Sequence, residues 1–161
     1  MQPHIPWVEK YRPNKFDDIV LDKFNRKILL NIIKTGSFPN IIFYGPPGTG
    51  KTTTIINLIK HYQEEHNEKN KNLVIHLNAS DDRGIDVIRN QIISFVHSNA
   101  LFVRGKKFII LDEVDYMTKN AQCALRTLIQ QCPNNVVFCL ICNYISRMDS
   151  SLQNEFVRLR F

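Results

Sequence analysis

A glycine-rich stretch at residues 45–52, GPPGTGKT, constrains this chain more than any other part of its sequence. It fits the pattern G-x-x-x-x-G-K-[ST], the loop that wraps the phosphates of a nucleotide. The apolar run at 40–44 before it indicates a short buried strand, and the residues at 53–60 after it indicate a helix. Glycines let backbone N–H groups approach the phosphates, and the helix N-terminus adds partial positive charge. The sequence therefore predicts a nucleotide-binding site.

Two side chains of this loop suit chemistry on a nucleotide. Lys51 can reach the β- and γ-phosphates, and the Thr52 hydroxyl can ligate Mg²⁺. The structural alternative is a Gly/Pro-rich turn that happens to precede a lysine, and the flanking strand and helix argue against it. The predicted phosphate-side contacts are Gly45, Pro46, Pro47, Gly48, Thr49, Gly50, Lys51, Thr52 and Thr53.

The rest of the chain alternates apolar runs typical of strands with stretches of helical periodicity. This alternation predicts an α/β fold in which a five-stranded parallel sheet carries helices on both faces. A length of 161 residues suits one domain with its own core. The predicted strands cover 40–44, 73–77, 108–111, 135–142 and 156–161, and the predicted helices begin near 24, 53, 85, 118 and 150.

Polar side chains follow two of the predicted strands. In a parallel sheet, ligands bind beyond the carboxyl ends of the strands. Asp112 follows the strand at 108–111 and is expected to hold Mg²⁺ through water. Glu113 is expected to orient and deprotonate an attacking water, and such a general base typically contributes about 10²–10⁴-fold. Asn143 could position the γ-phosphate or the water, or it could be an ordinary turn residue. The predicted catalytic set is thus Lys51, Glu113 and Asn143.

Cys139 and Cys142 have the C-x-x-C spacing of redox and zinc sites. Both lie in a predicted buried strand, where an odd separation puts the two side chains on opposite faces. No second C-x-x-C and no paired histidines complete a zinc site in the sequence. The cysteines are therefore expected to be core thiols, which suits the cytosol or the nucleus.

The net charge of +6 suits a partner rich in phosphate. No apolar run approaches the ~18 residues that would span a bilayer, and the N-terminus lacks the pattern of a signal peptide. No membrane partner is expected. The stretch at 7–13, WVEKYRP, could be a loop packed on the flank of the domain or one wall of a ligand pocket.

Longer stretches carry a resemblance to a known family. WVEKYRP at 7–13, LNASDDRGI at 77–85, DEVD at 112–115 and LICNY at 140–144 occur in that order around the phosphate loop. Together they resemble the small subunits of replication factor C, the eukaryotic clamp loader and an AAA+ ATPase. The resemblance extends over 7–161, and its stretches at 7–13 and 77–85 are far more specific than the phosphate loop.

The resemblance implies an ATP-binding subunit of a hetero-pentamer in the nucleus. ATP with Mg²⁺ would help the complex to open a ring-shaped sliding clamp and load it onto primer–template DNA during replication and repair. Asn143 then corresponds to the sensor 1 residue, and Asn78 to a switch that holds Glu113 idle until DNA binds. The implied adenine contacts are Val8, Tyr11, Arg12 and Pro13, and the implied DNA-backbone contacts are Arg83, Arg89 and Lys119.

The sequence departs from the family pattern at 154–156. The family usually has Ser-Arg-Cys there, and its arginine completes the ATP site of a neighbouring subunit. This chain has Asn154, Glu155 and Phe156. An arginine finger is typically worth about 10³–10⁵ in rate, and a carboxylate cannot replace it. This subunit is therefore expected to bind ATP without activating its neighbour.

The family continues with a lid domain and a collar, which are absent from 1–161. These residues are therefore expected to be the AAA+ core of a longer chain, with weak nucleotide binding and negligible turnover alone. One alternative is an ATP-binding scaffold subunit that does not hydrolyse. Another is a DNA helicase of the DExD type, suggested by DEVD at 112–115, and a small-molecule kinase is less favoured still.

Overall fold

A computed structural model describes residues 13, 16–68, 70–80, 85–98 and 105–161 of the chain. A five-stranded sheet with the order β2-β3-β4-β1-β5 forms its centre, and every pair of neighbouring strands is parallel. This arrangement confirms the predicted fold class. The strands are β1 (Ile41–Tyr44), β2 (Val74–Asn78), β3 (Lys107–Asp112), β4 (Val136–Cys142) and β5 (Val157–Arg160).

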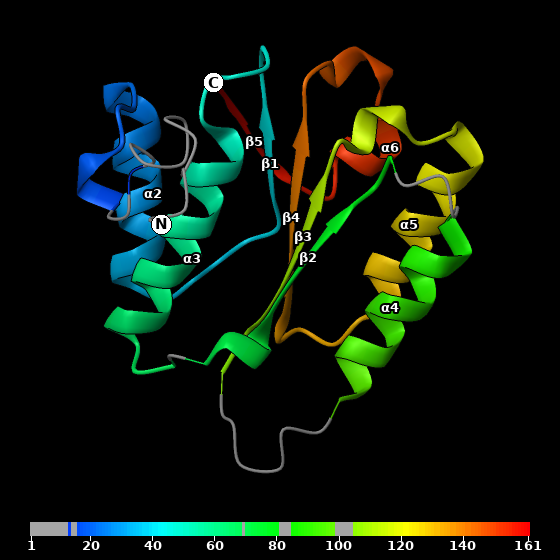
Figure 1. Cartoon of the computed structure of the whole chain (residues 1–161), viewed down its shortest axis with the longest axis horizontal. Coiled ribbons are helices and arrows are strands. Elements are labelled where there is room, and N and C mark those ends of the chain that lie inside the picture. The colour runs from blue at the N-terminus through cyan, green and yellow to red at the C-terminus, as the bar shows by residue number, and fades with distance from the viewer. Residues whose placement is uncertain (1–12, 14–15, 69, 81–84, 99–104) are drawn as a thin grey trace, which may run out of the picture.

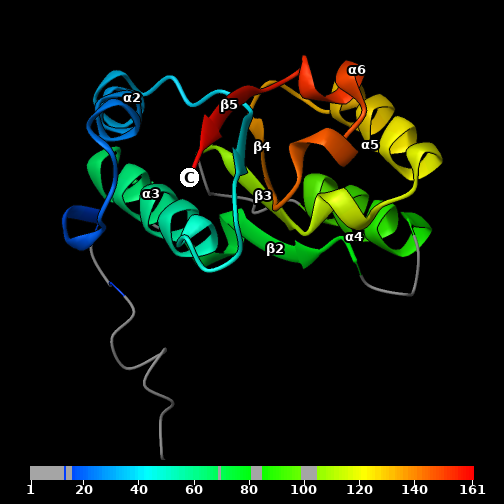
Figure 2. The same cartoon turned by 90° about the horizontal axis from the view of Figure 1, so that it is seen from above.

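Helices cover both faces of the sheet, as Figures 1 and 2 show. The helices α2 (Lys23–Thr35) and α3 (Lys51–Glu65) lie on one face. The helices α4 (Ile85–His97), α5 (Lys119–Gln131) and α6 (Ser150–Gln153) lie on the other. Short 3₁₀ turns connect these elements: η1 (Phe16–Asp18), η2 (Lys71–Leu73), η3 (Val114–Tyr116) and η4 (Ile145–Arg147).

Side chains that alternate between the two faces of the buried strands form two hydrophobic cores. On β3, Phe108 and Ile110 pack with α2 and α3, whereas Ile109 and Leu111 pack with α4 and α5. All seven residues of β4 are buried. Continuous apolar runs of this kind are expected in a parallel sheet, because helices cover both of its faces.

The two cysteines of the C-x-x-C pattern lie in different cores, as predicted. Cys139 packs on the α2–α3 side and Cys142 on the α4–α5 side, and both are free thiols. Burial raises the pKa of Cys139 far above its ordinary value, and burial with the nearby Asp115 carboxylate raises the pKa of Cys142 to about 12. Both therefore remain neutral core side chains at physiological pH.

Local sequence signals fix the ends of the helices. The Asp22 carboxylate caps α2 by accepting hydrogen bonds from the N–H groups of Phe24 and Asn25. The C-cap of α2 is Gly36, which has a φ of 69°. The Thr118 hydroxyl caps α5 by accepting the N–H of Ala121, as the sequence predicts. None of the helices in the described residues is long and apolar enough to cross a bilayer.

The strand register brings several loops to one edge of the sheet. Tyr44 at the end of β1 pairs with Cys142 at the end of β4, and Asn78 at the end of β2 pairs with Asp112 at the end of β3. The residues that follow these strands therefore lie close together, at the upper edge of the sheet in Figure 1.

Candidate functional site

The phosphate loop connects β1 to α3 and depends on two glycine conformations. Gly50, with a φ of 88°, is the N-cap of α3. Gly45 has a φ of 149°, and a Cβ at this position would lie 2.1 Å from the carbonyl oxygen of Phe161. The Phe161 N–H donates to the Tyr44 carbonyl at 2.8 Å, so the chain after β5 packs directly on the start of the loop. Glycine is required where these two backbones meet.

Lys51, the first residue of α3, is buried, with 6% of its surface exposed. Its Nζ donates to the carbonyls of Gly45 and Pro46, each at 2.8 Å, and to Asn143 Oδ1 at 3.0 Å. Burial lowers the pKa of Lys51, and the carboxylates of Asp112 and Asp115 oppose this effect. The structure thus brings together Lys51 and Asn143, which the sequence assigns to one site.

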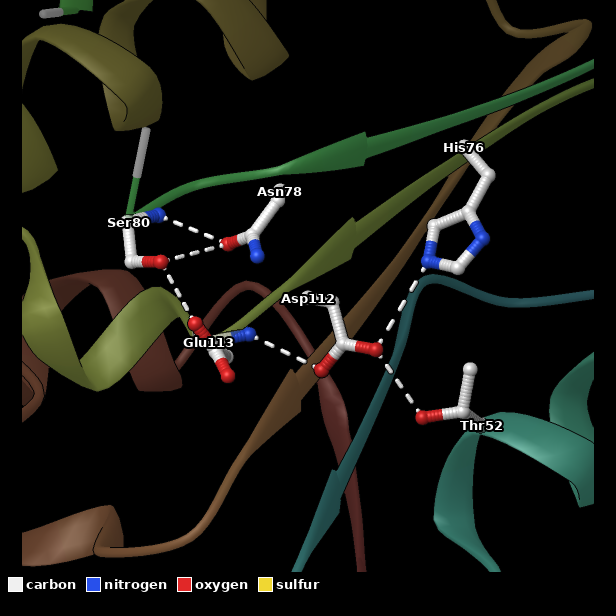
Figure 3. A network of polar contacts seen from close by, with 6 residues as sticks. All are labelled: Thr52, His76, Asn78, Ser80, Asp112 and Glu113. Atoms are coloured by element: carbon white, nitrogen blue, oxygen red, sulfur yellow. Dashed lines mark hydrogen bonds and ion pairs between the residues drawn. The ribbon is translucent and has the colours of Figure 1, made fainter. Parts of the chain in front are cut away.

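Thr52 and Asp112 also meet, as their predicted roles require. The Thr52 hydroxyl donates to Asp112 Oδ2 at 2.9 Å, and Asp112 Oδ1 accepts the Glu113 N–H at 3.0 Å (Figure 3). His76 Nε2 lies 3.6 Å from Asp112 Oδ2. Burial alone would raise the pKa of Asp112, but the nearby His76 and the hydrogen bonds from Thr52 and the Glu113 N–H hold it below its ordinary value. An ionised carboxylate beside a threonine hydroxyl suits a hydrated Mg²⁺.

Glu113 has a left-handed backbone, with a φ of 58°, and its carboxylate is engaged by a serine. Ser80 Oγ lies 2.5 Å from Glu113 Oε2, and the Ser80 N–H and Oγ lie 2.9 and 2.8 Å from Asn78 Oδ1 (Figure 3). Among the described residues, Asn78, the expected switch, therefore reaches Glu113 through Ser80. The Asn78 side chain bonds its own backbone two residues on, as asparagine commonly does in turns.

Asn57 ties the described end of the 7–13 stretch to the phosphate-loop helix. Its buried side chain donates to the carbonyl of Pro13 at 2.9 Å and to that of Thr53 at 3.0 Å. Sequence reasoning missed Asn57, although a polar residue among the apolar positions of α3 was a usable signal. The other predicted adenine contacts, Val8, Tyr11 and Arg12, lie outside the described residues.

Two of the three predicted DNA contacts lie on the α4–α5 side of the sheet. Arg89 is exposed on α4, and Lys119 is exposed as the first residue of α5. Arg83 lies outside the described residues. Glu155, at the position where the resemblance predicts an arginine, accepts from Arg126 Nε at 3.2 Å and from Gln130 Nε2 at 2.7 Å.

Comparison with known proteins identifies the family. The model of the "ATPase family associated with various cellular activities (AAA)" matches residues 41–161. The chain belongs to this family of ATPases. The match includes the phosphate loop, Asp112, Glu113 and Asn143 within one family domain.

Relatives in several eukaryotes are replication factor C subunits. The chain is 44% identical to human replication factor C subunit 5 and 44% identical to subunit 3 of Saccharomyces cerevisiae, each over 158 residues. These matches cover 98% of this chain and 46% of either relative, so the chain spans about half of their length. The segment LICNY at 140–144 also resembles these two subunits more than the other members of the family.

Solved structures of two Thermotoga maritima proteins have the same fold. The Holliday junction branch migration motor RuvB of Thermotoga maritima has a TM-score of 0.67 and 17% identity over 93% of this chain and 48% of its own. A DNA polymerase III gamma subunit-related protein of the same organism has a TM-score of 0.65 and 16% identity over 84% of this chain and 45% of its own. At these identities the similarity establishes the fold alone.

The contact between Gly45 and Phe161 predicts unequal effects of two alanine substitutions. At Gly48 an added Cβ meets nothing within 4 Å, and φ is 79°. Gly48→Ala should therefore cost only the backbone term, about 1–2 kcal/mol. Gly45→Ala should cost more, because the new Cβ must displace the Phe161 carbonyl. Urea unfolding followed by circular dichroism measures the loss of unfolding free energy in each variant. Equal losses would show that Phe161, directly after β5, moves away from the new Cβ without cost.

Proposed function

We propose that this chain is an ATP-binding subunit of a replication factor C-type clamp loader in the nucleus. With its partner subunits it would use ATP binding and hydrolysis to open a sliding clamp and load it onto primer–template DNA. The convergence at one sheet edge of Lys51 with Asn143 and of Thr52 with Asp112 carries the proposal. The relatives' names favour this function over a DExD-type helicase or a small-molecule kinase.

The nucleotide's phosphates would lie in the loop at the start of α3. There, backbone N–H groups and the helix N-terminus favour negative charge. Lys51 Nζ would turn from Asn143 Oδ1 toward the β- and γ-phosphates, which lie within reach of the same loop. The adenine would lie beside the segment that ends at Pro13 and includes Val8, Tyr11 and Arg12. Of these residues, Pro13 accepts a hydrogen bond from Asn57 of α3.

Thr52 and Asp112 fit a magnesium ion. Their side chains are already 2.9 Å apart, and the pKa of Asp112 is held low enough to keep it ionised. When bound there with ATP, Mg²⁺ neutralises charge on the phosphate oxygens. Thr52 would be the direct ligand, and Asp112 would accept hydrogen bonds from water bound to the ion.

Glu113 would accept the proton of the attacking water. In this structure Ser80 Oγ engages Glu113 Oε2, so the serine competes with a water for that oxygen. We therefore assign the structure to an idle state, from which Asn78 and Ser80 must release Glu113 before hydrolysis.

Toward the neighbouring subunit, we propose that this chain is passive. Glu155 is held by Arg126 and Gln130 of α5 and offers no cation at the position of the family's trans-acting arginine. The chain would then hydrolyse ATP in its own site and leave its neighbour's site unstimulated.

Arg89 and Lys119, exposed at α4 and α5, would contact the DNA backbone, because exposed cations suit phosphate contact without base recognition.

Glu113→Gln should separate binding from hydrolysis in the assembled complex. The amide cannot take a proton, so this subunit's turnover should fall by about 10²–10⁴-fold while its ATP is retained. Retention of radiolabelled ATP and steady-state ATPase measure the two effects. Glu65→Gln, at the exposed end of α3, is the matched control. Unchanged hydrolysis with Glu113→Gln would refute the assignment of Glu113 as base.

Ser80→Ala should have the opposite effect. It removes the hydroxyl that engages Glu113, and a hydrogen bond to a charged group is worth about 1.5–3 kcal/mol. ATPase without DNA should therefore rise, by up to about tenfold, and stimulation by DNA should shrink. Ser37→Ala, at an exposed loop position, should change neither rate. A fall in the DNA-independent rate with Ser80→Ala would contradict an idling contact.

A further inference from the structure

Asp115 is a buried carboxylate to which neither the sequence nor the proposed chemistry assigns a role. It lies on η3 with 5% of its surface exposed. Its Oδ2 accepts the N–H of Tyr144 at 3.2 Å. Among the buried side-chain atoms of the described residues, its Oδ1 is the oxygen without a hydrogen-bond partner. Such an arrangement is costly, because a buried charge is normally paired.

The Asp115–Tyr144 hydrogen bond joins two turns of the site. Asp115 lies two residues after Glu113, the proposed base, and Tyr144 directly follows Asn143. The turns η3 and η4 also pack against each other. One carboxylate thus connects the turn that follows Glu113 with the residue that follows Asn143.

The Asp115 carboxylate also acts electrostatically on Lys51. Burial lowers the pKa of Lys51, whereas the Asp115 carboxylate opposes this effect, so the two side chains lie within electrostatic range. Cys142 is a neutral thiol with a pKa of about 12. Among the described residues, the anions that act on the Lys51 ammonium are therefore Asp112 and Asp115. Lys51 in turn contacts Asn143 Oδ1 at 3.0 Å.

We infer that Asp115 is a positioning residue for Asn143: by holding the Tyr144 peptide it fixes the Asn143 amide against Lys51, where the γ-phosphate is proposed to bind. A charge-assisted hydrogen bond is shorter and stronger than a neutral one, and this favours a carboxylate over a neutral acceptor. The inference rests on the proposed ATP site. It gives Asp115 no contact with the substrate, and predicts that its loss alters the distinction between a triphosphate and a diphosphate.

The test compares the affinities of the full-length chain for ATPγS and ADP. Asp115→Ala should lower the ratio of the two affinities about tenfold, as Asn143→Ala should, and change ADP affinity less than twofold. Asp115→Asn keeps an oxygen that can accept the Tyr144 N–H but loses the charge, so its ratio should lie between those of wild type and Asp115→Ala. Asp22→Ala removes the cap of α2, and should lower the melting temperature without changing the ratio.

A wild-type ratio in Asp115→Ala, with a reduced ratio in Asn143→Ala, would overturn the inference and leave the proposed function intact. If Asp115→Ala does not fold, Asp115→Asn decides, and a wild-type ratio in that variant overturns the inference. Failure of the wild-type chain to bind either nucleotide would overturn the proposed function and the inference together.

Discussion

The parallel pairing of β4 with β1 and β3 is the constraint on which the site depends. Its register aligns the ends of these strands, so the phosphate loop, Asp112 and Asn143 emerge at one edge. Shifting a strand by one residue would turn its side chains to the opposite face of the sheet. Because both faces are buried, such a shift would move each apolar side chain into the other close-packed core, where it does not fit, and packing therefore fixes the geometry of the site.

Charge burial gives the site its chemical character. Lys51 and Asp115 are both almost fully buried, and Asp112 is partly so. Backbone carbonyls and Asn143 satisfy Lys51, whereas Asp112 is held by Thr52, His76 and the Glu113 N–H. Asp112, held in this way, needs little rearrangement when a charged ligand arrives, which favours electrostatic catalysis, whereas Lys51 would have to turn from Asn143. The same burial has an energetic cost, because charged groups are removed from water.

Local pattern and strand order made much of this structure predictable. The five strands, the cap at Thr118 and the separation of Cys139 from Cys142 follow from apolar periodicity and capping chemistry. The convergence of Lys51, Thr52, Asp112 and Asn143 follows from the rule that parallel strands end at one edge. The engagement of Glu113 by Ser80, the contact of His76 with Asp112 and the Asn57–Pro13 tie were not predictable, because they depend on rotamers and on contacts between distant segments.

The most direct test of the central claim is the binding of a fluorescent ATP analogue to the full-length chain with and without Mg²⁺. Binding should be stronger with Mg²⁺. Lys51→Ala should weaken it by roughly 10- to 100-fold, since hydrogen bonds to charged groups are worth about 1.5–3 kcal/mol. Lys60→Ala, at an exposed position of α3, should leave it unchanged. Absence of binding, or equal binding by Lys51→Ala and wild type, would contradict the account.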